Sequence, residues 1–180
     1  MGHRRTHLLR LAVAASALVL DQASKWWILT HVMQPPRIIP VTPFFNLVLG
    51  WNRGVSFGLF AVGAEIGAWF LPALALAIVA GLAVWLWRTE SGLVAGALGL
   101  IVGGALGNVV DRLRFDGAVA DFLDLHAFGY HWPAFNVADS AITVGAMILV
   151  AESLFGGADR LKHRGGVDGR ARRGDADGGR

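Results

Sequence analysis

Asp121 and Asp139 are the acidic residues whose type and spacing could do chemistry in this chain. They lie 18 residues apart, on either side of a loop, and neither has a basic neighbour within one helical turn. Two carboxylates close together in a low dielectric cannot both ionise, so one holds a proton while the other is a base. Such a pair suits amide hydrolysis, because one Asp deprotonates a water and the other protonates the leaving amine. Spacing alone leaves two separate, solvated acids as the alternative.

Other hydrolytic chemistries find less support in the sequence. The chain has no cysteine, which excludes disulfides, thiolate nucleophiles and Cys-ligated metals. It has no HExxH pair for zinc, and no Gly-rich phosphate loop or haem attachment motif. A Ser–His hydrolase could use Ser56 or Ser140 as the nucleophile and His31, His126 or His131 as the base. No GxSxG motif accompanies these residues. We therefore expect no metal and no cofactor.

The elements that must position these acids are membrane spans. Apolar residues make up 54% of the 180-residue chain and charged residues only 16%, against roughly a quarter in soluble domains. A span needs about 20 mostly apolar residues. Four segments come close and define one domain over residues 1–156, with spans at about 8–30, 66–87, 92–112 and 137–155. The chain's beginning also imitates a secretory signal, but apolar sequence resumes after it and we expect an uncleaved span.

The distribution of Lys and Arg gives the expected orientation. Arginines crowd the N-terminal flank, and 7 of the 16 Lys and Arg residues lie in positions 160–180, whereas the long link between spans one and two holds two. By the positive-inside rule both termini face the cytoplasm, and segments 34–60 and 113–136 are extracytoplasmic. Residues 157–180 are rich in Gly, Arg and Asp and lack aromatics, so we expect a disordered basic cytoplasmic tail that binds no nucleic acid.

Both extracytoplasmic segments and span three carry local signals. Residues 44–51 are aromatic and β-branched and lie between Pro43 and Gly50, which predicts a strand in a small sheet or hairpin. The segment 113–136 contains aromatics suited to a membrane interface and has the length of a mobile lid. Span three has glycines at small-xxx-small spacing, which favours close helix packing over a ligand role.

This topology brings nearly every polar residue outside the cytoplasmic flanks to one face of the membrane. Buried charges are costly there, at about 2.5–3.5 kcal/mol each on insertion scales, so compensation is expected. Three pairs have the spacing for it on one helical face: Asp21 with Lys25, Asn108 with Arg112, and Asn136 with Asp139. A structural ion pair is the alternative for Asp21 and Lys25. Local pairing or headgroup contact is the alternative for Asp111 and Arg112.

Five ordered sequence blocks resemble the bacterial lipoprotein signal peptidases (signal peptidase II). They are DQASK at 21–25, NRGVSFG at 52–58, GGALGNVVDR at 103–112, VADFLD at 119–124 and FNVADSAITVG at 135–145. The resemblance implies an all-α membrane protein with four transmembrane helices, a small extracytoplasmic β-sheet cradle and a membrane-surface helix. It implies an aspartic endopeptidase of the bacterial inner membrane that cleaves prolipoproteins before a cysteine bearing diacylglycerol.

The resemblance also assigns the site. Asp121 and Asp139 become the catalytic pair, with Asp124 the alternative to Asp121 because the preceding link is one residue longer than expected. Which aspartate holds the proton stays open. The residues that line or support the site are Asp21, Lys25, Asn52, Gly54, Asn108, Asp111, Arg112, Asn136 and Ala138.

Expected partners are lipid-modified prolipoproteins and membrane lipids, and the expected state is a monomer. The alternative function is a small proton-coupled transporter that uses Asp21, Lys25, Asp111 and Asp139 as a relay. It would need charges along a whole pathway and an internal repeat, and the sequence has neither. A membrane adaptor with purely structural acids is a further alternative.

Overall fold

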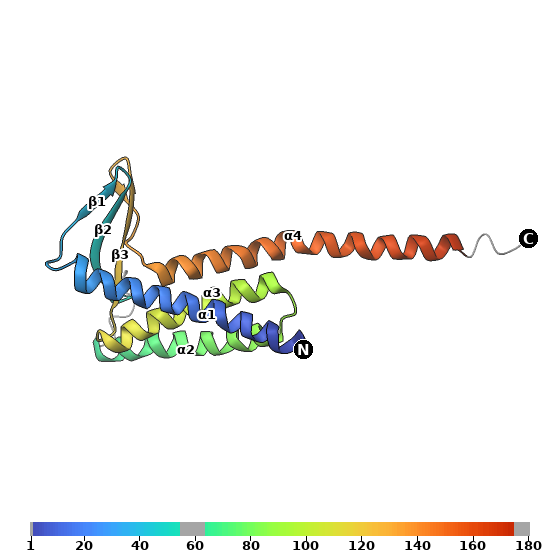
Figure 1. Cartoon of the computed structure of the whole chain (residues 1–180), viewed down its shortest axis with the longest axis horizontal. Helices are drawn as coiled ribbons and strands as arrows, with labels where there is room; N and C mark the ends of the chain where they lie inside the picture. The colour runs from blue at the N-terminus through green and yellow to red at the C-terminus, as the bar shows by residue number, and fades with distance from the viewer. Residues whose placement is uncertain (1, 55–63, 175–180) are drawn as a thin grey trace, which may run out of the picture.

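The computed structural model describes residues 2–54 and 64–174 as four long helices and a small sheet at one end of them (Figure 1). The elements in chain order are α1 Gly2–Trp27, the π-helical turn η1 Ile28–Val32, β1 Ile39–Thr42, β2 Phe45–Asn52, α2 Ala64–Arg88, α3 Gly92–Arg114, β3 Val119–Ala127, β4 Tyr130–His131 and α4 Val137–Gly174.

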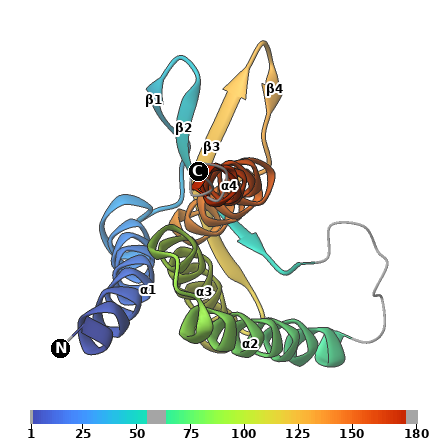
Figure 2. The ribbon, with the colours of Figure 1, turned by 90° about the vertical axis from the view of Figure 1, so that its right-hand side faces the viewer.

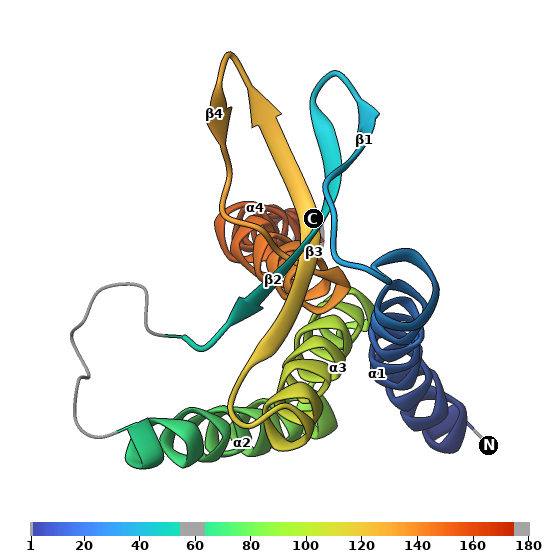
Figure 3. The same cartoon turned by 90° about the vertical axis from the view of Figure 1, so that its left-hand side faces the viewer.

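The helix α3 is the centre of the bundle. It packs against α1, α2 and α4, and the three surround it when the bundle is viewed from either end (Figures 2 and 3). The beginning of α1 and the far part of α4 point to the end of the bundle opposite the sheet (Figure 1). The beginning of α1 and the far part of α4 therefore lie on the same side, and the sheet lies on the other.

Close helix approach at the glycines of α3 agrees with the packing role expected from their spacing. A methyl group on Gly103 would overlap the carbonyl oxygen of Ala14 in α1. A methyl group on Gly104 would lie 2.5 Å from the carbonyl oxygen of Ala138 in α4. Backbones this close leave no room for a side chain, so these glycines set the distance between the helices.

Gly103→Ala is expected to destabilise the bundle by about 1–3 kcal/mol, the usual cost of overpacking, because the obstacle is backbone that cannot move aside. Gly96→Ala is the matched control in the same helix, where nothing lies within 4 Å of the new methyl group. It should instead stabilise by about 0.5–1 kcal/mol, since Ala favours the helix. Equilibrium unfolding in mixed micelles measures both, and equal effects would contradict this account of α3.

Among the described residues, three helices are long and apolar enough to cross a membrane: Phe70–Arg88, Gly92–Arg114 and Val137–Phe155. They agree with the predicted second, third and fourth spans. The helix α1 has the length but carries Arg10, Asp21 and Lys25, so the count of four spans stays a prediction.

The buried Arg10 donates through Nη1 to the carbonyl oxygens of Leu86 (3.2 Å) and Trp87 (3.1 Å). These two carbonyl oxygens lie in the last turn of α2, where a helix runs out of backbone donors of its own, and Arg10 supplies one.

The sheet is antiparallel with strand order β1-β2-β3-β4. The strand β2 confirms the strand predicted at 44–51. The strands β3 and β4 were not predicted, and they occupy the segment 113–136 for which a mobile link was expected. Their turn is Phe128-Gly129, with φ of +52° and +82°, the two positive values that a tight type I′ hairpin requires. Gly129 adopts such a φ without strain.

The sequence also led us to expect a disordered tail, a membrane-surface helix and a site contribution from the NRGVSFG block. The fourth helix continues through Gly174, and the disorder expected for the tail from residue 157 stays a prediction. Because this stretch contains no proline, nothing in it interrupts the helical hydrogen bonds. No separate surface helix occurs within 2–54 and 64–174, so the predicted membrane-surface helix stays a prediction. Most of the NRGVSFG block, including Ser56, lies outside the described residues.

Candidate active site

Asp121 lies on β3 with its side chain directed into the molecule and only 3% of its surface exposed. Its Oδ1 accepts a hydrogen bond from Nδ2 of Asn136 at 2.7 Å, and Asn52 donates to the same carboxylate. Burial, helped by the negative charge of Asp139, raises the pKa of Asp121 to about 6, although the two asparagine hydrogen bonds oppose the shift. This carboxyl group is therefore suited to carrying a proton.

Asp139 lies in the first turn of α4, where its backbone and side chain form a reciprocal cap with Asn136. The Asp139 N–H donates to Oδ1 of Asn136 at 3.0 Å, and the Asn136 N–H donates to Oδ2 of Asp139 at 3.1 Å. This is the capping-box arrangement, and a negative charge at a helix N-terminus is electrostatically favourable. The i, i+3 spacing predicted from the sequence is realised, and it fixes the Asp139 carboxylate.

Two asparagines, Asn108 and Asn136, connect the aspartates. Asn108 on α3 donates through Nδ2 to Oδ1 of Asp139 at 2.8 Å. The fully buried Asn136 donates through Nδ2 to Asp121 and also lies 3.3 Å from Oδ1 of Asn108. One short chain of amides thus holds both carboxylates, so the acids predicted as a pair do meet in one site.

Lys25 contacts Asn108 and lies between two further carboxylates. Its Nζ is 2.9 Å from Oδ2 of Asp21, 3.0 Å from Oδ2 of Asp111 and 3.0 Å from Oδ1 of Asn108. The side chains of Asp21, Lys25 and Asp111 are 0%, 2% and 1% exposed. The expected Asp21–Lys25 pair is present, whereas Asp111 pairs with Lys25 and not with its neighbour Arg112.

These carboxylates also bind the backbone of the segments that carry the aspartates. Oδ1 of Asp21 accepts from the N–H of Ala138 at 2.9 Å, one residue before Asp139. Oδ2 of Asp111 accepts from the N–H of Ala120 at 3.1 Å, one residue before Asp121. The buried charges therefore position both acids through the main chain.

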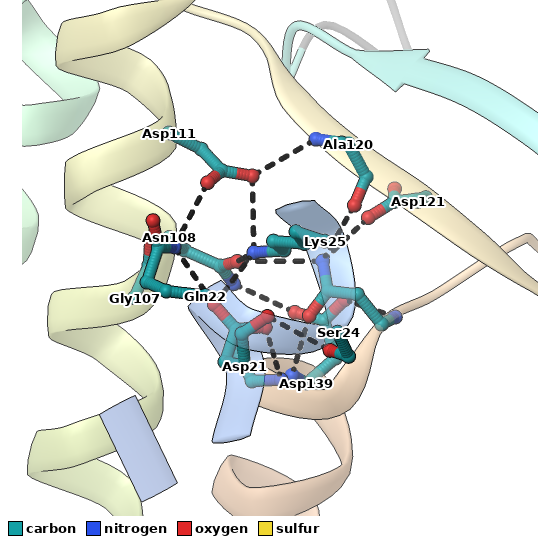
Figure 4. Close-up of polar contacts among 12 residues, drawn as sticks. Asp21, Gln22, Ser24, Lys25, Gly107, Asn108, Asp111, Ala120, Asp121 and Asp139 are labelled. Atoms are coloured by element: carbon teal, nitrogen blue, oxygen red, sulfur yellow. Dashed lines mark hydrogen bonds and ion pairs between the residues drawn. The ribbon is translucent and has the colours of Figure 1, made fainter. Parts of the chain in front are cut away.

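Sequence reasoning missed Gln22. Its Nε2 lies 3.1 Å from Oδ2 of Asp21, 3.0 Å from Oδ1 of Asp111 and 3.1 Å from the carbonyl oxygen of Gly107 (Figure 4). A neutral donor between two carboxylates relieves their repulsion without adding charge. Its place inside the DQASK block, beside Asp21, was the available signal.

The remaining predicted residues are Asn52 and Gly54 at the end of β2 and Arg112 on α3. Asn52 ends β2, and its Oδ1 accepts from the N–H of Gly54 at 2.8 Å, which fixes a tight turn. Gly54 has φ +72°, a value that favours glycine. Arg112 donates to the backbone oxygen of Asn108 at 3.5 Å, and its charge interacts with Asp121 and Asp139. Within the described residues, its buried Nε has no hydrogen-bond partner.

Asp124 lies apart from the pair. Residues three apart on a strand point to opposite faces, so Asp121 and Asp124 cannot share a site. Asp124 instead accepts from Asn46 at 2.8 Å and contacts Nδ1 of His131 at 2.9 Å. Burial opposes ionisation here, but the contacts with His131 and Asn46 hold the pKa of Asp124 below its usual range. The tertiary structure thus favours Asp121 over Asp124 as the partner of Asp139.

Two cavities open beside the aspartates. One of about 400 Å³ is lined by Gly50, Trp51, Asn52, Arg53, Asp121, Pro133 and Ala134. The other, of about 380 Å³, is lined by Leu125, Trp132, Phe135, Asp139, Ser140, Thr143 and Val144. Among the described residues, no group of three or more His, Cys, Asp or Glu side chains is arranged to hold a metal ion.

Comparison with known proteins places the chain in a family. The model described as signal peptidase (SPase) II matches residues 13–155. A lipoprotein signal peptidase of Methylobacterium sp. (strain 4-46) is 47% identical over 84% of this chain and 92% of its own length. One of Methylorubrum extorquens (strain PA1) is 49% identical over 80% of this chain and 84% of its own length.

A solved structure agrees with the sequence relatives. It is described as a bacterial membrane enzyme, has a TM-score of 0.71 and 30% identity, and the match covers 82% of this chain and 93% of the other. Sequence and fold point the same way over nearly all of the described helices and sheet, and the chain belongs to the signal peptidase II family of membrane peptidases.

Proposed function

We propose that this chain is an intramembrane aspartic endopeptidase that removes signal peptides from diacylglyceryl-modified prolipoproteins, cleaving before the lipidated cysteine. Family membership supports the peptidase and the prolipoprotein substrate. The observation that carries the aspartic mechanism is the chain of amides that joins the carboxylates of Asp121 and Asp139 through Asn136 and Asn108.

In the proposed reaction Asp121 starts protonated and Asp139 ionised. Asp139 accepts a proton from a water, whose oxygen attacks the scissile carbonyl carbon and forms a tetrahedral intermediate. The carbon–nitrogen bond then breaks, and Asp121 gives its proton to the departing amine. A carboxyl group with a pKa near 6 is a competent acid near neutral pH, which is why we assign the proton to Asp121.

The neighbours have supporting roles in this scheme. Asn108 and Asn136 orient the two carboxylates. The Asp21–Lys25–Asp111 triad holds the backbone that carries them, because Asp21 accepts from the N–H of Ala138 and Asp111 from the N–H of Ala120. Arg112 has a buried donor without a partner in the described chain and is the candidate to stabilise the oxyanion. Asn52 and Gly54 form the rim that meets the peptide.

The proposed membrane arrangement follows the charge distribution. All four helices cross the bacterial inner membrane, both termini are cytoplasmic, and the sheet and the aspartates face outward. The beginning of α1 and the far part of α4 lie at the same end of the bundle, away from the sheet, which supports this arrangement (Figure 1). The protein acts as a monomer, and diacylglyceryl chains in the outer leaflet lie at the depth of the site.

The test is cleavage of a diacylglyceryl-modified prolipoprotein by the full-length chain in detergent micelles. Mass spectrometry should find the free signal peptide and a mature product that begins with the lipidated cysteine. The unlipidated prolipoprotein is the matched control and should stay intact. A proton-coupled transporter would instead move protons across proteoliposomes without cleaving, and that outcome would overturn the proposal.

The pH dependence of the rate tests which aspartate holds the proton. Because Asp121 must be protonated in the free enzyme and its pKa is about 6, kcat/KM should fall as pH rises through that value. The slope should approach about tenfold per pH unit. Asp116→Asn, which changes an exposed carboxyl outside the site, should leave the profile unaltered. A rate independent of pH across this range would assign the proton elsewhere.

A further inference from the structure

A cavity of about 430 Å³, the Arg114 cavity, lies where the end of α1, the strand β2 and the end of α3 meet. Its lining includes Trp26, Thr30, Gln34, Trp51, Arg114 and Phe115. Among the described residues that line it, neither Asp121 nor Asp139 is found, although Trp51 also borders the cavity beside Asp121. A volume of this size falls in the range of small-ligand sites, about 300–1,000 Å³. The Arg114 cavity is therefore a separate candidate binding site.

Arg114 gives this cavity a positive charge. Its side chain is exposed, and its guanidinium lies 5.2 Å from the centroid of the Phe115 ring. The Phe115 ring in turn meets Trp51 edge to face, with centroids 5.0 Å apart. Among the side chains that the structure describes, the ion pairs are those of Lys25 and His131, and none includes Arg114. Such a guanidinium can still offer its planar set of N–H donors to an anion.

Two further polar side chains line the same cavity. Nε2 of Gln34 donates to the carbonyl oxygen of Leu29 at 2.9 Å, and an amide nitrogen carries a second hydrogen that can donate to a ligand. The hydroxyl of Thr30 donates to the carbonyl oxygen of Trp26 at 2.6 Å, which fixes its side chain. The lining, over the described residues, contains no Asp or Glu. The field inside the cavity therefore favours an anion.

The Arg114 cavity lies at the level of membrane headgroups. Arg114 is the last residue of α3, a helix apolar enough to cross a membrane, and α1 ends at Trp27 on the same sheet end of the bundle (Figure 1). Trp26 and Trp51 are 53% and 48% exposed, and tryptophan is typical of the headgroup level. Towards the hydrocarbon, the exposed Val19 shares a face of α1 with Trp26, seven residues later. A phospholipid is the anion that combines this depth with an apolar attachment.

We propose that the Arg114 cavity binds the phosphate of an anionic phospholipid in the outer leaflet. Arg114 and Gln34 donate to the phosphate oxygens. Trp26 and Trp51 contact the glycerol, and the acyl chains leave along the face of α1 that carries Val19. The diacylglyceryl group of the proposed substrate carries no phosphate, so the ligand is a lipid of the membrane itself. The inference rests on the proposed membrane arrangement but not on the cleavage reaction.

Native mass spectrometry of the full-length chain in detergent micelles tests this inference. The chain is titrated with dioleoylphosphatidylglycerol, with dioleoylglycerol, which has the same acyl chains and no phosphate, and with soluble glycerol phosphate. Arg114→Gln removes the charge in the cavity. Arg37→Gln is the matched control, an identical change at another exposed arginine, two residues before β1 and outside the lining.

The wild-type chain should bind one phosphatidylglycerol about tenfold more tightly than dioleoylglycerol, and Arg114→Gln should weaken that Kd by about tenfold, the scale of a charge-assisted hydrogen bond. Arg37→Gln should change it by less than about twofold, since an exposed charge away from the ligand is screened. Equal weakening in both variants would assign the attraction to diffuse charge and overturn the site. Soluble glycerol phosphate bound as tightly as the lipid would overturn the lipid as the ligand. Because no substrate is present, failure of the proposed peptidase function would leave these results unchanged.

Discussion

Asp121→Asn and Asp139→Asn are each expected to lower kcat for a lipidated prolipoprotein by about 10⁴-fold, the upper range for general acid–base catalysis. Asparagine keeps the size and the hydrogen-bond acceptor but can neither carry the transferable proton nor act as a base. The measurement is single-turnover cleavage of the diacylglyceryl-modified substrate, with binding followed separately. Binding should persist, because the change removes a proton-transfer step and not a contact surface.

The matched control for this loss is Asp116→Asn. Asp116 is exposed and has φ +53°, a backbone conformation that Asn tolerates well. It should retain the wild-type rate. The Asp121→Asn, Asp139→Asn double variant should be no slower than either single variant, because residues that act as one unit are not additive. Turnover retained in either single variant would contradict the aspartic mechanism.

Lys25→Met is expected to lower the free energy of unfolding by about 3–5 kcal/mol, the usual cost of breaking a buried ion pair. It leaves Asp21 and Asp111 buried without the ion pairs that Lys25 makes, and both side chains are at most 1% exposed. Because these two carboxylates hold the N–H groups of Ala138 and Ala120, activity should fall as well. Equilibrium unfolding in mixed micelles measures the stability. Arg88→Met, at an exposed position, is the control and should change it by less than about 0.5 kcal/mol.

A compensated variant distinguishes charge from packing at this triad. Asp21→Asn and Asp111→Asn, combined with Lys25→Met, remove all three charges while each Asn keeps an oxygen for its backbone N–H. We expect most of the lost stability to return, since replacing a whole buried ion network is far less costly than removing one partner. If the triple variant is as unstable as Lys25→Met alone, the loss comes from packing and not from the unpaired charges.

Local features of the fold were predictable because local sequence causes them. The spans predicted at 66–87 and 92–112 correspond to α2 at Ala64–Arg88 and α3 at Gly92–Arg114. Uninterrupted apolar runs of this length leave a chain in a membrane no alternative to the helix. The strand predicted at 44–51 is β2, Phe45–Asn52. The pairs Asp21–Lys25 and Asn136–Asp139 also form, since helical spacing alone brings such residues together.

Other features depend on contacts between distant segments. The strand β3 was missed because its first residues are buried on both faces, so the alternation that marks a strand is lacking. The tight glycine contacts of α3 with α1 and α4 exclude side chains only because three backbones meet there. Gln22 was overlooked because a neutral amide gains significance only from the two carboxylates that it bridges.

The sequence by itself determined which residue types could hydrolyse an amide and that apolar helices would bring them to one end of the molecule. It left Asp121 and Asp124 as alternatives, and it placed Asp111 next to Arg112. Only the tertiary structure paired Asp111 with Lys25, directed Asp124 to His131 and joined Asp121 to Asp139 through Asn136. The physical reason is that periodicity fixes neighbours within one helix or strand, whereas a site built from β3, α3 and α4 depends on how those elements pack.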